Sequence, residues 1–236
     1  MDDEATFRQE VRTVCQLYHQ AEALHQTGVH VISLDEKTGI QALERLHPTR
    51  PMEPGKPEAK EFEYIRHGTQ ALIANFEVAT GQVIAPTVGD TRTEEDLVTH
   101  IRQTVATDPL GQWVFIADQL NTHKSAGLVQ AVAELCGLDE DLGQKGQAGI
   151  LHSMATRAAF LQDDSHRIRL VYTPKHCSWL NQVEMWFGIL TRRLLKRGQF
   201  TSTEELKHRI LAFIEFFNNT LAQPFRWTYI GRPLLR

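Results

Sequence analysis

Apolar residues recur at three- and four-residue steps near the start of the chain, which is the period of a helix with one buried face. The stripe consists of Phe7, Val11, Val14, Leu17, Ala21 and Leu24. Gly28 follows the last apolar position and is a typical helix stop. We therefore predict an amphipathic helix over 4–26. It makes residues 1–28 a helical lead-in to a larger domain over 29–236.

Short runs of β-branched and apolar residues, typical of strands, come next. They occupy residues 29–36, 69–89, 113–118 and 167–173. The run over 69–89 predicts two strands joined as a hairpin at Thr80 and Gly81. The Pro-dense stretch 48–59 predicts an irregular loop.

Four more helices are predicted between and after these strands, over residues 91–106, 125–136, 178–197 and 203–217. Residues 137–164 contain a loop and a short helix, and we interpret them as a surface insertion. Three strands in sequence, followed by strand–helix units, predict a mixed sheet with helices on both faces. Active residues in such sheets lie just beyond the strand ends.

Composition narrows the class of protein. Of the 236 residues 42% are hydrophobic and 23% charged, which predicts an ordinary globular protein with a real core. The chain has no run of about 18 apolar residues, so we expect no membrane span. The acidic, polar N-terminus is unlike a secretory signal, and the three scattered cysteines predict a reducing cytoplasm with neither disulfides nor a zinc knuckle.

Charge is distributed unevenly along the chain. The formal net charge is −4, but from Ser165 onward 12 Lys and Arg face four Asp and Glu. The C-terminal third therefore carries +8 and the remainder −12. A basic segment on an acidic body favours a nucleic-acid partner. A set of solvated helix faces is the alternative.

Three acidic residues are candidates for an active site. Asp35 and Asp118 each end an apolar run, and Glu184 lies about two turns into the predicted helix 178–197. Glu184 borders the apolar stripe of that helix, so we expect its carboxylate to be partly buried. Buried carboxylates are costly unless they are paired or bound to a cation.

Three carboxylates without a Cys or His cluster favour a hard cation, Mg²⁺ or Mn²⁺. Two such ions would suit phosphodiester chemistry, since one activates the attacking oxygen and the other stabilises the leaving oxygen. The alternative is structural, because acids at strand ends also form turns and cap helices.

Four motifs carry a resemblance to a known family. They are "VISLDEKTGIQALER", "EYIRHGTQALIANFEVATG", "FIADQLNTHKS" and "YTPKHCSWLNQVEMWFGILTRRLLKRGQF". Together they resemble the catalytic domain of bacterial insertion-sequence transposases, in the insertion-sequence-630 branch of the mariner superfamily. The resemblance implies an α/β, ribonuclease-H-like (retroviral-integrase-like) fold with a mixed five-stranded sheet. It also implies that Asp35, Asp118 and Glu184 are the catalytic ligands of Mg²⁺ or Mn²⁺, with two ions in each site.

The resemblance further implies DNA cleavage at transposon ends followed by strand transfer into target DNA, with a homodimer as the active complex. A nuclease of the same fold that only hydrolyses, and a catalytically idle DNA-binding remnant, are the alternatives. Two departures stand out. The last two acids are 66 positions apart, about twice the family's usual spacing, and residues 137–164 account for the excess. Full-length members carry helix-turn-helix modules before this domain, so we expect a truncated piece, the second frame of a split transposase or a decayed copy.

Other residues in these motifs are candidates for contacts with DNA. Asn121 and His123 follow Asp118 and match the motif after the family's second Asp. They would position a scissile phosphate or a water on the ion, although Asn121 could instead cap the next helix. Candidate phosphate-binding and auxiliary residues are Lys175, His176, Asn181, Arg192, Arg193, Lys196 and Arg197. A solvated basic face is the alternative for the last four.

Four further residues have less specific roles. We expect Trp179 and Trp186 to pack the helix rather than stack on a base. We expect His67 to pack as well. Glu36 is a possible auxiliary acid, but adjacent strand residues point to opposite faces, so Glu36 and Asp35 should not bind the same ion.

Overall fold

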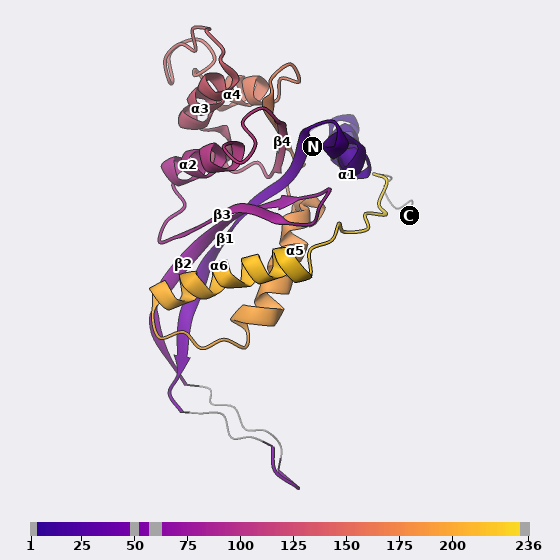
Figure 1. Ribbon diagram of the computed structural model, residues 1–236. Helices are drawn as coiled ribbons and strands as arrows, with labels where there is room; N and C mark the ends of the chain where they lie inside the picture. The colour runs from indigo at the N-terminus through magenta and orange to yellow at the C-terminus, as the bar shows by residue number, and fades with distance from the viewer. Residues whose placement is uncertain (1–3, 48–51, 57–62, 232–236) are drawn as a thin grey trace.

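A five-stranded sheet with the order β3-β2-β1-β4-β5 forms the centre of the protein. The computed structural model describes residues 4–47, 52–56 and 63–231 (Figure 1). The strands are β1 Val29–Arg45, β2 Tyr64–Glu77, β3 Val83–Gly89, β4 Gln112–Ala117 and β5 Ile168–Tyr172. β1 pairs antiparallel with β2 and parallel with β4, so the sheet is mixed, as predicted.

Helices cover both faces of the sheet, which confirms the expected layers (Figure 1). They are α1 Glu4–Gln26, α2 Glu94–Val105, α3 Ala126–Cys136, α4 Met154–Leu161, α5 Gln182–Leu190 and α6 Thr203–Thr220. Alternation along β1 sends Ile32 and Leu34 toward the core shared with α2, α3 and α4, and Val31 toward α1 on the other face. α5 packs on β1 and β2, and α6 on β2 and β3, over that second face.

The first helix packs on one face of the sheet through its own buried cluster. Val14 and Tyr18 of α1 are buried in one cluster with Val114 and Ile116 of β4. The Tyr18 hydroxyl also donates a hydrogen bond of 2.8 Å to the carbonyl of Leu180. The helical lead-in therefore packs directly on the sheet that carries Asp35.

Strand β1 is much longer than predicted. It was expected to end at residue 36, but pairing with β2 continues to Arg45 opposite Tyr64. The register shifts between Lys37 and Ile40, and Gly39 adopts a positive φ of 63° there. The polar residues after position 36 therefore form a bulge within a long antiparallel ladder rather than a turn.

Residues 137–164 contribute no strand to the sheet, as expected, but they are not confined to the surface. Leu151 and two residues of α4, Phe160 and Leu161, are buried in the core beneath α3 and β5. The predicted loop 48–59 lies mostly outside the described residues. Its described part, 52–56, is closed by a bridge between Glu53 and Lys56.

The predicted helix 178–197 is broken in the structure. A short 3-10 helix over Ser178–Leu180 precedes Asn181, whose backbone is extended, and α5 begins only at Gln182. A π-helical turn over Thr191–Leu195 follows α5.

The other predicted elements are present, although β2 begins at Tyr64 rather than at residue 69. The hairpin turn occurs where expected, with Gly81 at φ 73°. The three cysteines are free thiols. None of the helices in the described part of the chain is long and apolar enough to span a membrane.

Candidate active site

Asp35 and Asp118 lie at the same level, just past the end of the parallel pairing between β1 and β4. Parallel pairing between β1 and β4 ends with Ser33 opposite Ile116, and the residue two positions further on each strand is one of these acids. The expectation that Asp35 ends its strand is therefore wrong, because β1 continues beyond it to Arg45. The edge of the parallel pair still brings it to the same level as Asp118.

The carboxylate of Asp35 lies in a site with an excess of negative charge. Burial, the largest cause, and the nearby charges of Asp118, Glu36 and Glu184 together raise its pKa to about 7, against the lowering effect of the hydrogen bond from the Glu36 backbone. That N–H donates to Asp35 Oδ1 at 2.7 Å. The charges of Asp118 and Glu184 thus both act on Asp35, although the three acids are distant in sequence.

Glu184 differs from expectation in two respects. It lies in the first turn of α5 rather than about two turns into a helix, and its side chain is exposed rather than partly buried. Among the described residues, the ligand atoms of Asp35, Asp118 and Glu184 do not all lie within 4.8 Å of one another. A side-chain rotation is therefore needed before all three could share one cation.

Asn181 connects α5 to the strand that bears Asp35. It is fully buried, and its Nδ2 donates to the Leu34 carbonyl at 2.9 Å and to Asp35 Oδ2 at 3.3 Å. Its Oδ1 accepts from the Ser33 hydroxyl, whose oxygen accepts from the N–H of Val183 at 2.8 Å. Asn181 is thus a positioning residue, and its burial excludes the direct DNA contact that was one of its expected roles.

The His123 side chain forms an ion pair with the Asp118 carboxylate. It is fully buried, with Nδ1 2.8 Å from Asp118 Oδ1 and Nε2 3.0 Å from Glu36 Oε1. Burial alone would lower the pKa of His123, but its hydrogen bonds to Asp118 and Glu36 raise it to about 10. The pKa of Asp118 is lowered in turn, chiefly by the hydrogen bond from His123. Both ring nitrogens of His123 therefore have protein partners, and in this structure its contact within the site is with Asp118.

Asn121 is exposed at the start of a short 3-10 helix after β4. The alternative role, capping the next helix, is wrong because Ser125 caps α3: its Oγ accepts from the N–H of Leu128 at 3.2 Å. No hydrogen bond involves the Asn121 side chain within the described residues. Its amide is therefore available beside Asp118.

The loop that carries Lys175 and His176 borders a cavity of about 710 Å³ against the start of α1. Both side chains are exposed, and His176 has a positive φ of 62°, which is uncommon for a residue other than glycine. Burial and the charge of Lys175 lower the pKa of the neighbouring Lys124. Lys175 and His176 therefore lie beside Gln119, next to Asp118, in a cavity that Glu4 and Glu10 also line.

The four predicted basic residues at the end of the α5 segment, Arg192, Arg193, Lys196 and Arg197, are all exposed. None forms an ion pair within residues 4–47, 52–56 and 63–231. Arg192 and Arg193 lie in the π-helical turn and Lys196 just follows it. The four are therefore not spaced as on a straight α-helix, although all remain open to solvent.

The predicted packing roles of two tryptophans and of His67 have different outcomes. Trp186 is fully buried in the core with Phe217, as expected. Trp179 is 53% exposed with its ring edge against Tyr229, so the expected packing role is wrong for it. His67 does not pack in a core: it is partly exposed, and its Nε2 lies 2.8 Å from Glu44 Oε2.

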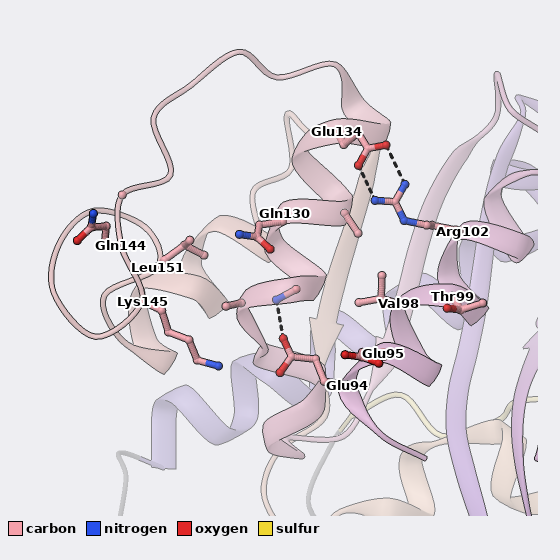
Figure 2. A pocket seen from close by; sticks show the side chains of 14 residues that line it. Glu94, Glu95, Val98, Thr99, Arg102, Gln130, Glu134, Gln144, Lys145 and Leu151 are labelled. Atoms are coloured by element: carbon pink, nitrogen blue, oxygen red, sulfur yellow. Dashed lines mark hydrogen bonds and ion pairs between the residues drawn. The ribbon is translucent and has the colours of Figure 1, made fainter. Parts of the chain in front are cut away.

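A larger cavity of about 870 Å³ lies away from these acids, between α2, α3 and residues 143–145 (Figure 2). Glu94, Glu95 and Glu134 line it, and Arg102 is paired with Glu134 (Figure 2). Glu94 accepts a hydrogen bond of 2.6 Å from the N–H of Gly127. None of the predicted site residues lines this cavity, and its acidic walls do not suit a phosphate backbone.

Some functional features could not be seen in the sequence. The Ser33–Asn181 bond joins residues 148 positions apart, and the Glu36–His123 pair spans 87 positions. Ser33 gives no signal beyond a small polar residue in an apolar run. Glu36 was noted only as an acid beside Asp35.

Known proteins share this architecture. The pre-cleavage Mos1 transpososome matches with a TM-score of 0.53 and 14% identity, over 91% of this chain and 56% of that chain. The Mos1 transposase catalytic domain with Raltegravir and Mn matches with a TM-score of 0.51 and 11% identity, over 91% of this chain and 84% of that chain. These likenesses confirm the expected ribonuclease-H-like fold.

The chain thus spans little more than half of the transposase chain in the first of these structures. A comparison with curated proteins finds no match. The family model described as DDE superfamily endonuclease matches residues 30–207, well over half of the sequence. The chain therefore belongs to the DDE superfamily endonucleases.

Proposed function

We propose that this chain is a transposase catalytic domain that cuts DNA at transposon ends and joins the released ends to target DNA. One observation supports this proposal above the others. Asp35 and Asp118 lie at the same level, just past the end of the parallel pairing between β1 and β4, and Glu184 is close enough to raise the pKa of Asp35. Membership of the DDE superfamily endonucleases supports the cleavage step. The fold shared with Mos1 transposase supports the transposition step.

The acids fit a hard divalent cation. Their donors are carboxylate oxygens, which Mg²⁺ and Mn²⁺ prefer. The pKa of Asp35 is raised first by burial and then by the negative charges of Asp118, Glu36 and Glu184, and a bound cation would offset both effects. We propose that Asp35, Asp118 and Glu184 hold two such ions. When bound, the ions would supply activation of the attacking oxygen and stabilisation of the leaving oxygen.

The remaining residues would orient these acids and the DNA. Asn181 would fix the Asp35 carboxylate through Oδ2, and His123 would hold Asp118 as its imidazolium. The exposed amide of Asn121 and the ammonium of Lys175 would contact the phosphates on either side of the cut. Catalysis of this kind comes mainly from positioning and charge neutralisation.

Narrower assignments are part of the same proposal. The four quoted motifs support membership of the insertion-sequence-630 branch and a bacterial, cytoplasmic setting. A homodimer would bring two transposon ends together. A nuclease that only hydrolyses and a catalytically idle remnant are the competing functions.

Incubation of the chain with duplex DNA bearing its element's ends, in Mn²⁺, tests the function. We expect cleaved ends with 3′-hydroxyls and, with target DNA present, a joined product on a sequencing gel. Cleavage without joining would favour the hydrolytic nuclease. Cation binding without any cleavage would favour the idle remnant.

Cation binding should release a proton from the site near neutral pH. Since the pKa of Asp35 is raised to about 7, its carboxyl is largely protonated at pH 6 and ionised at pH 8. Mg²⁺ affinity should therefore rise with pH across this window. Calorimetry at pH 6 in buffers of different ionisation enthalpy should detect the proton, and buffer-independent heats would contradict the expectation.

The exposed basic residues after α5 should contribute salt-dependent affinity for any DNA. Each phosphate neutralised by a cationic side chain releases counterions, so Arg193→Ala with Arg197→Ala should reduce the log–log salt slope by up to about two. Filter binding over a range of salt concentrations measures this slope.

The matched control replaces Arg102 and Lys145, which line the acidic cavity between α2 and α3, and should leave the slope unchanged. An equal slope for wild type and the Arg193/Arg197 variant would instead mean that these residues form a solvated face.

A further inference from the structure

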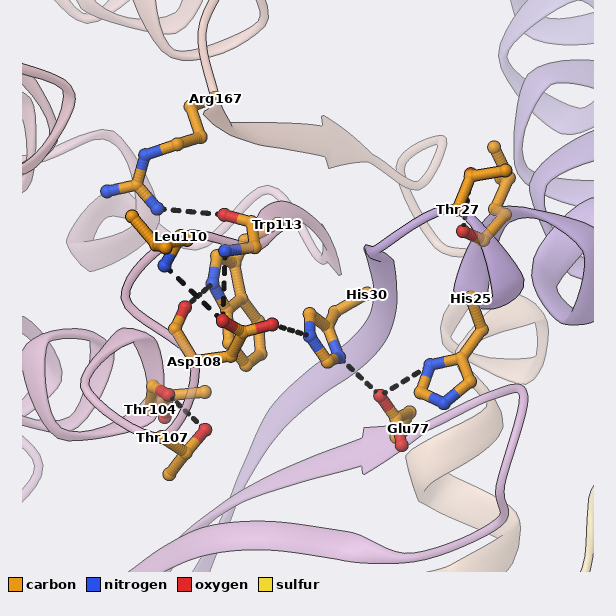
Figure 3. Close-up of polar contacts among 12 residues, drawn as sticks. His25, Thr27, His30, Glu77, Thr104, Thr107, Asp108, Leu110, Trp113 and Arg167 are labelled. Atoms are coloured by element: carbon orange, nitrogen blue, oxygen red, sulfur yellow. Dashed lines mark hydrogen bonds and ion pairs between the residues drawn. The ribbon is translucent and has the colours of Figure 1, made fainter.

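Three potential metal ligands converge beside the start of β1, away from the catalytic acids (Figure 3). His25 comes from the last turn of α1, His30 from the start of β1, and Glu77 from the end of β2. Within residues 4–47, 52–56 and 63–231, no other group of three His, Cys, Asp or Glu has ligand atoms within 4.8 Å of one another. His30 precedes Asp35 by five residues, roughly 17 Å along a strand.

The ligand atoms already approach the spacing of a tetrahedral site. Glu77 Oε1 lies 3.4 Å from His25 Nδ1 and 2.6 Å from His30 Nδ1. Zinc–ligand bonds of about 2.0–2.1 Å place neighbouring ligand atoms roughly 3.3 Å apart in a tetrahedron. The His25–Glu77 pair meets this spacing, and the His30–Glu77 pair needs to open by about 0.7 Å.

The two carboxyl oxygens that face the ring nitrogens of His30 require a positive charge on the ring or beside it. Its Nδ1 faces Glu77 and its Nε2 lies 3.1 Å from Asp108 Oδ2, whereas a neutral imidazole has only one N–H. The Asp108 carboxyl oxygen serves as the acceptor for an N–H at Nε2. With the N–H at Nε2, the Nδ1 lone pair faces Glu77 and requires a second proton or a cation between them.

His25 supplies an independent observation. Its Nδ1 is buried and makes no hydrogen bond, yet it is directed at the Glu77 oxygen that His30 also faces (Figure 3). A cation at the centre of the three atoms would satisfy both nitrogens and the buried Glu77 carboxylate together. A proton shared between His30 and Glu77 would leave His25 unsatisfied.

Surrounding contacts hold these side chains as outer partners hold the ligands of a metal. The Thr80 hydroxyl donates to Glu77 Oε2 at 2.6 Å, and the Trp113 ring stacks on His30 at 4.1 Å. A Cβ on Gly111 would lie 2.6 Å from Asp108 Oδ2 and 3.0 Å from His30 Cδ2. Glycine at this position therefore permits the close approach of Asp108 to His30.

We propose that His25, His30 and Glu77 bind one Zn²⁺ ion that ties α1 to the sheet, separately from the cations of the catalytic acids. Two imidazoles and one carboxylate are a donor set for Zn²⁺, whereas an oxygen-only set favours Mg²⁺. The side chain of His25 is 37% exposed, which leaves a side open to water as a fourth ligand.

Zinc titration of the chelator-stripped full chain, in competition with a chromophoric chelator, tests the proposal. We expect one tight equivalent for the wild type and a loss of affinity of at least about 100-fold for His25→Ala, which removes a ligand outright. Zn²⁺ should also raise the thermal midpoint of the wild type but not of His25→Ala. The exposure of His25 makes it a better first variant than the buried Glu77.

Two controls identify the site. His152→Ala removes an exposed histidine outside the cluster and should keep the tight equivalent, as should Asp35→Asn at the catalytic site. The proposal is overturned if the wild type binds no tight equivalent or if His25→Ala retains it. Loss of the equivalent in Asp35→Asn would likewise overturn it, because the ion would then belong to the catalytic acids.

Discussion

Asp118→Asn and Asp35→Asn should each reduce metal-dependent DNA cleavage by at least about 100-fold, since even outer partners of metal ligands usually contribute 10–100-fold. Each change removes a charged oxygen donor with almost no change in shape. Single-turnover cleavage of end DNA in Mg²⁺ measures the loss. DNA affinity should stay within about twofold, because phosphate contacts elsewhere dominate it.

Asp35→Asn should also remove an electrostatic cost from the apo protein. The folded-state pKa of Asp35 is raised to about 7 from 3.8, so ionisation of Asp35 destabilises the fold progressively between these values. At pH 8 without metal, the variant should be at least as stable as the wild type in urea. Asp164→Asn, at an exposed carboxylate outside the site, is the control and should cleave normally. Wild-type cleavage by Asp35→Asn or Asp118→Asn would refute the ligand assignment.

His123→Ala should be the most destabilising change near the site, by about 3–5 kcal/mol, because it leaves one member of a buried ion pair alone. The Glu36 side chain is only 3% exposed and loses its partner at Nε2. Asp118 loses the imidazolium that orients it, so cleavage should fall as well. Urea unfolding followed by circular dichroism measures the stability.

A second change separates charge from packing at this position. Glu36→Gln in the His123→Ala background removes the unpaired charge and should recover part of the lost stability. His176→Ala, at an exposed histidine on the same side of the molecule as Lys175, should cost little. A loss below about 1 kcal/mol for His123→Ala would mean that water reaches Glu36 and replaces the imidazolium.

Local chemistry in the sequence was enough to predict most of the elements. The apolar stripe of α1 has a helical period, and Thr93 begins α2 with the capping box formed with Asp96. The alternation of Val31 and Ile32 assigns the two faces of β1. These signals depend on neighbouring residues, so a single sequence contains them.

The identities of the candidate catalytic acids also follow from the sequence. Asp118 comes directly after a short buried strand, and the quoted motifs match Asp35 and Glu184 to the acids of a known family. Their shared site was therefore expected before any geometry was known. The sequence could not state that Glu184 is exposed in the first turn of α5.

Tertiary structure decided the features that depend on partners from distant segments. β1 continues past Glu36 because β2 pairs with it as far as Arg45, whereas the polar residues after Glu36 look locally like a turn. The helix after β5 is interrupted at Asn181 because that buried amide bonds to Leu34 and Asp35 instead of continuing a helix.

The charge networks were likewise decided by the fold. His123 carries no local sign that it will be buried between Glu36 and Asp118, and His25 and His30 meet Glu77 only when α1, β1 and β2 come together. The sequence by itself determined the order of elements and the candidate acids, because periodicity and residue type are local properties. Only the tertiary structure decided which charges are buried together, because desolvation and hydrogen bonding depend on residues far apart along the chain.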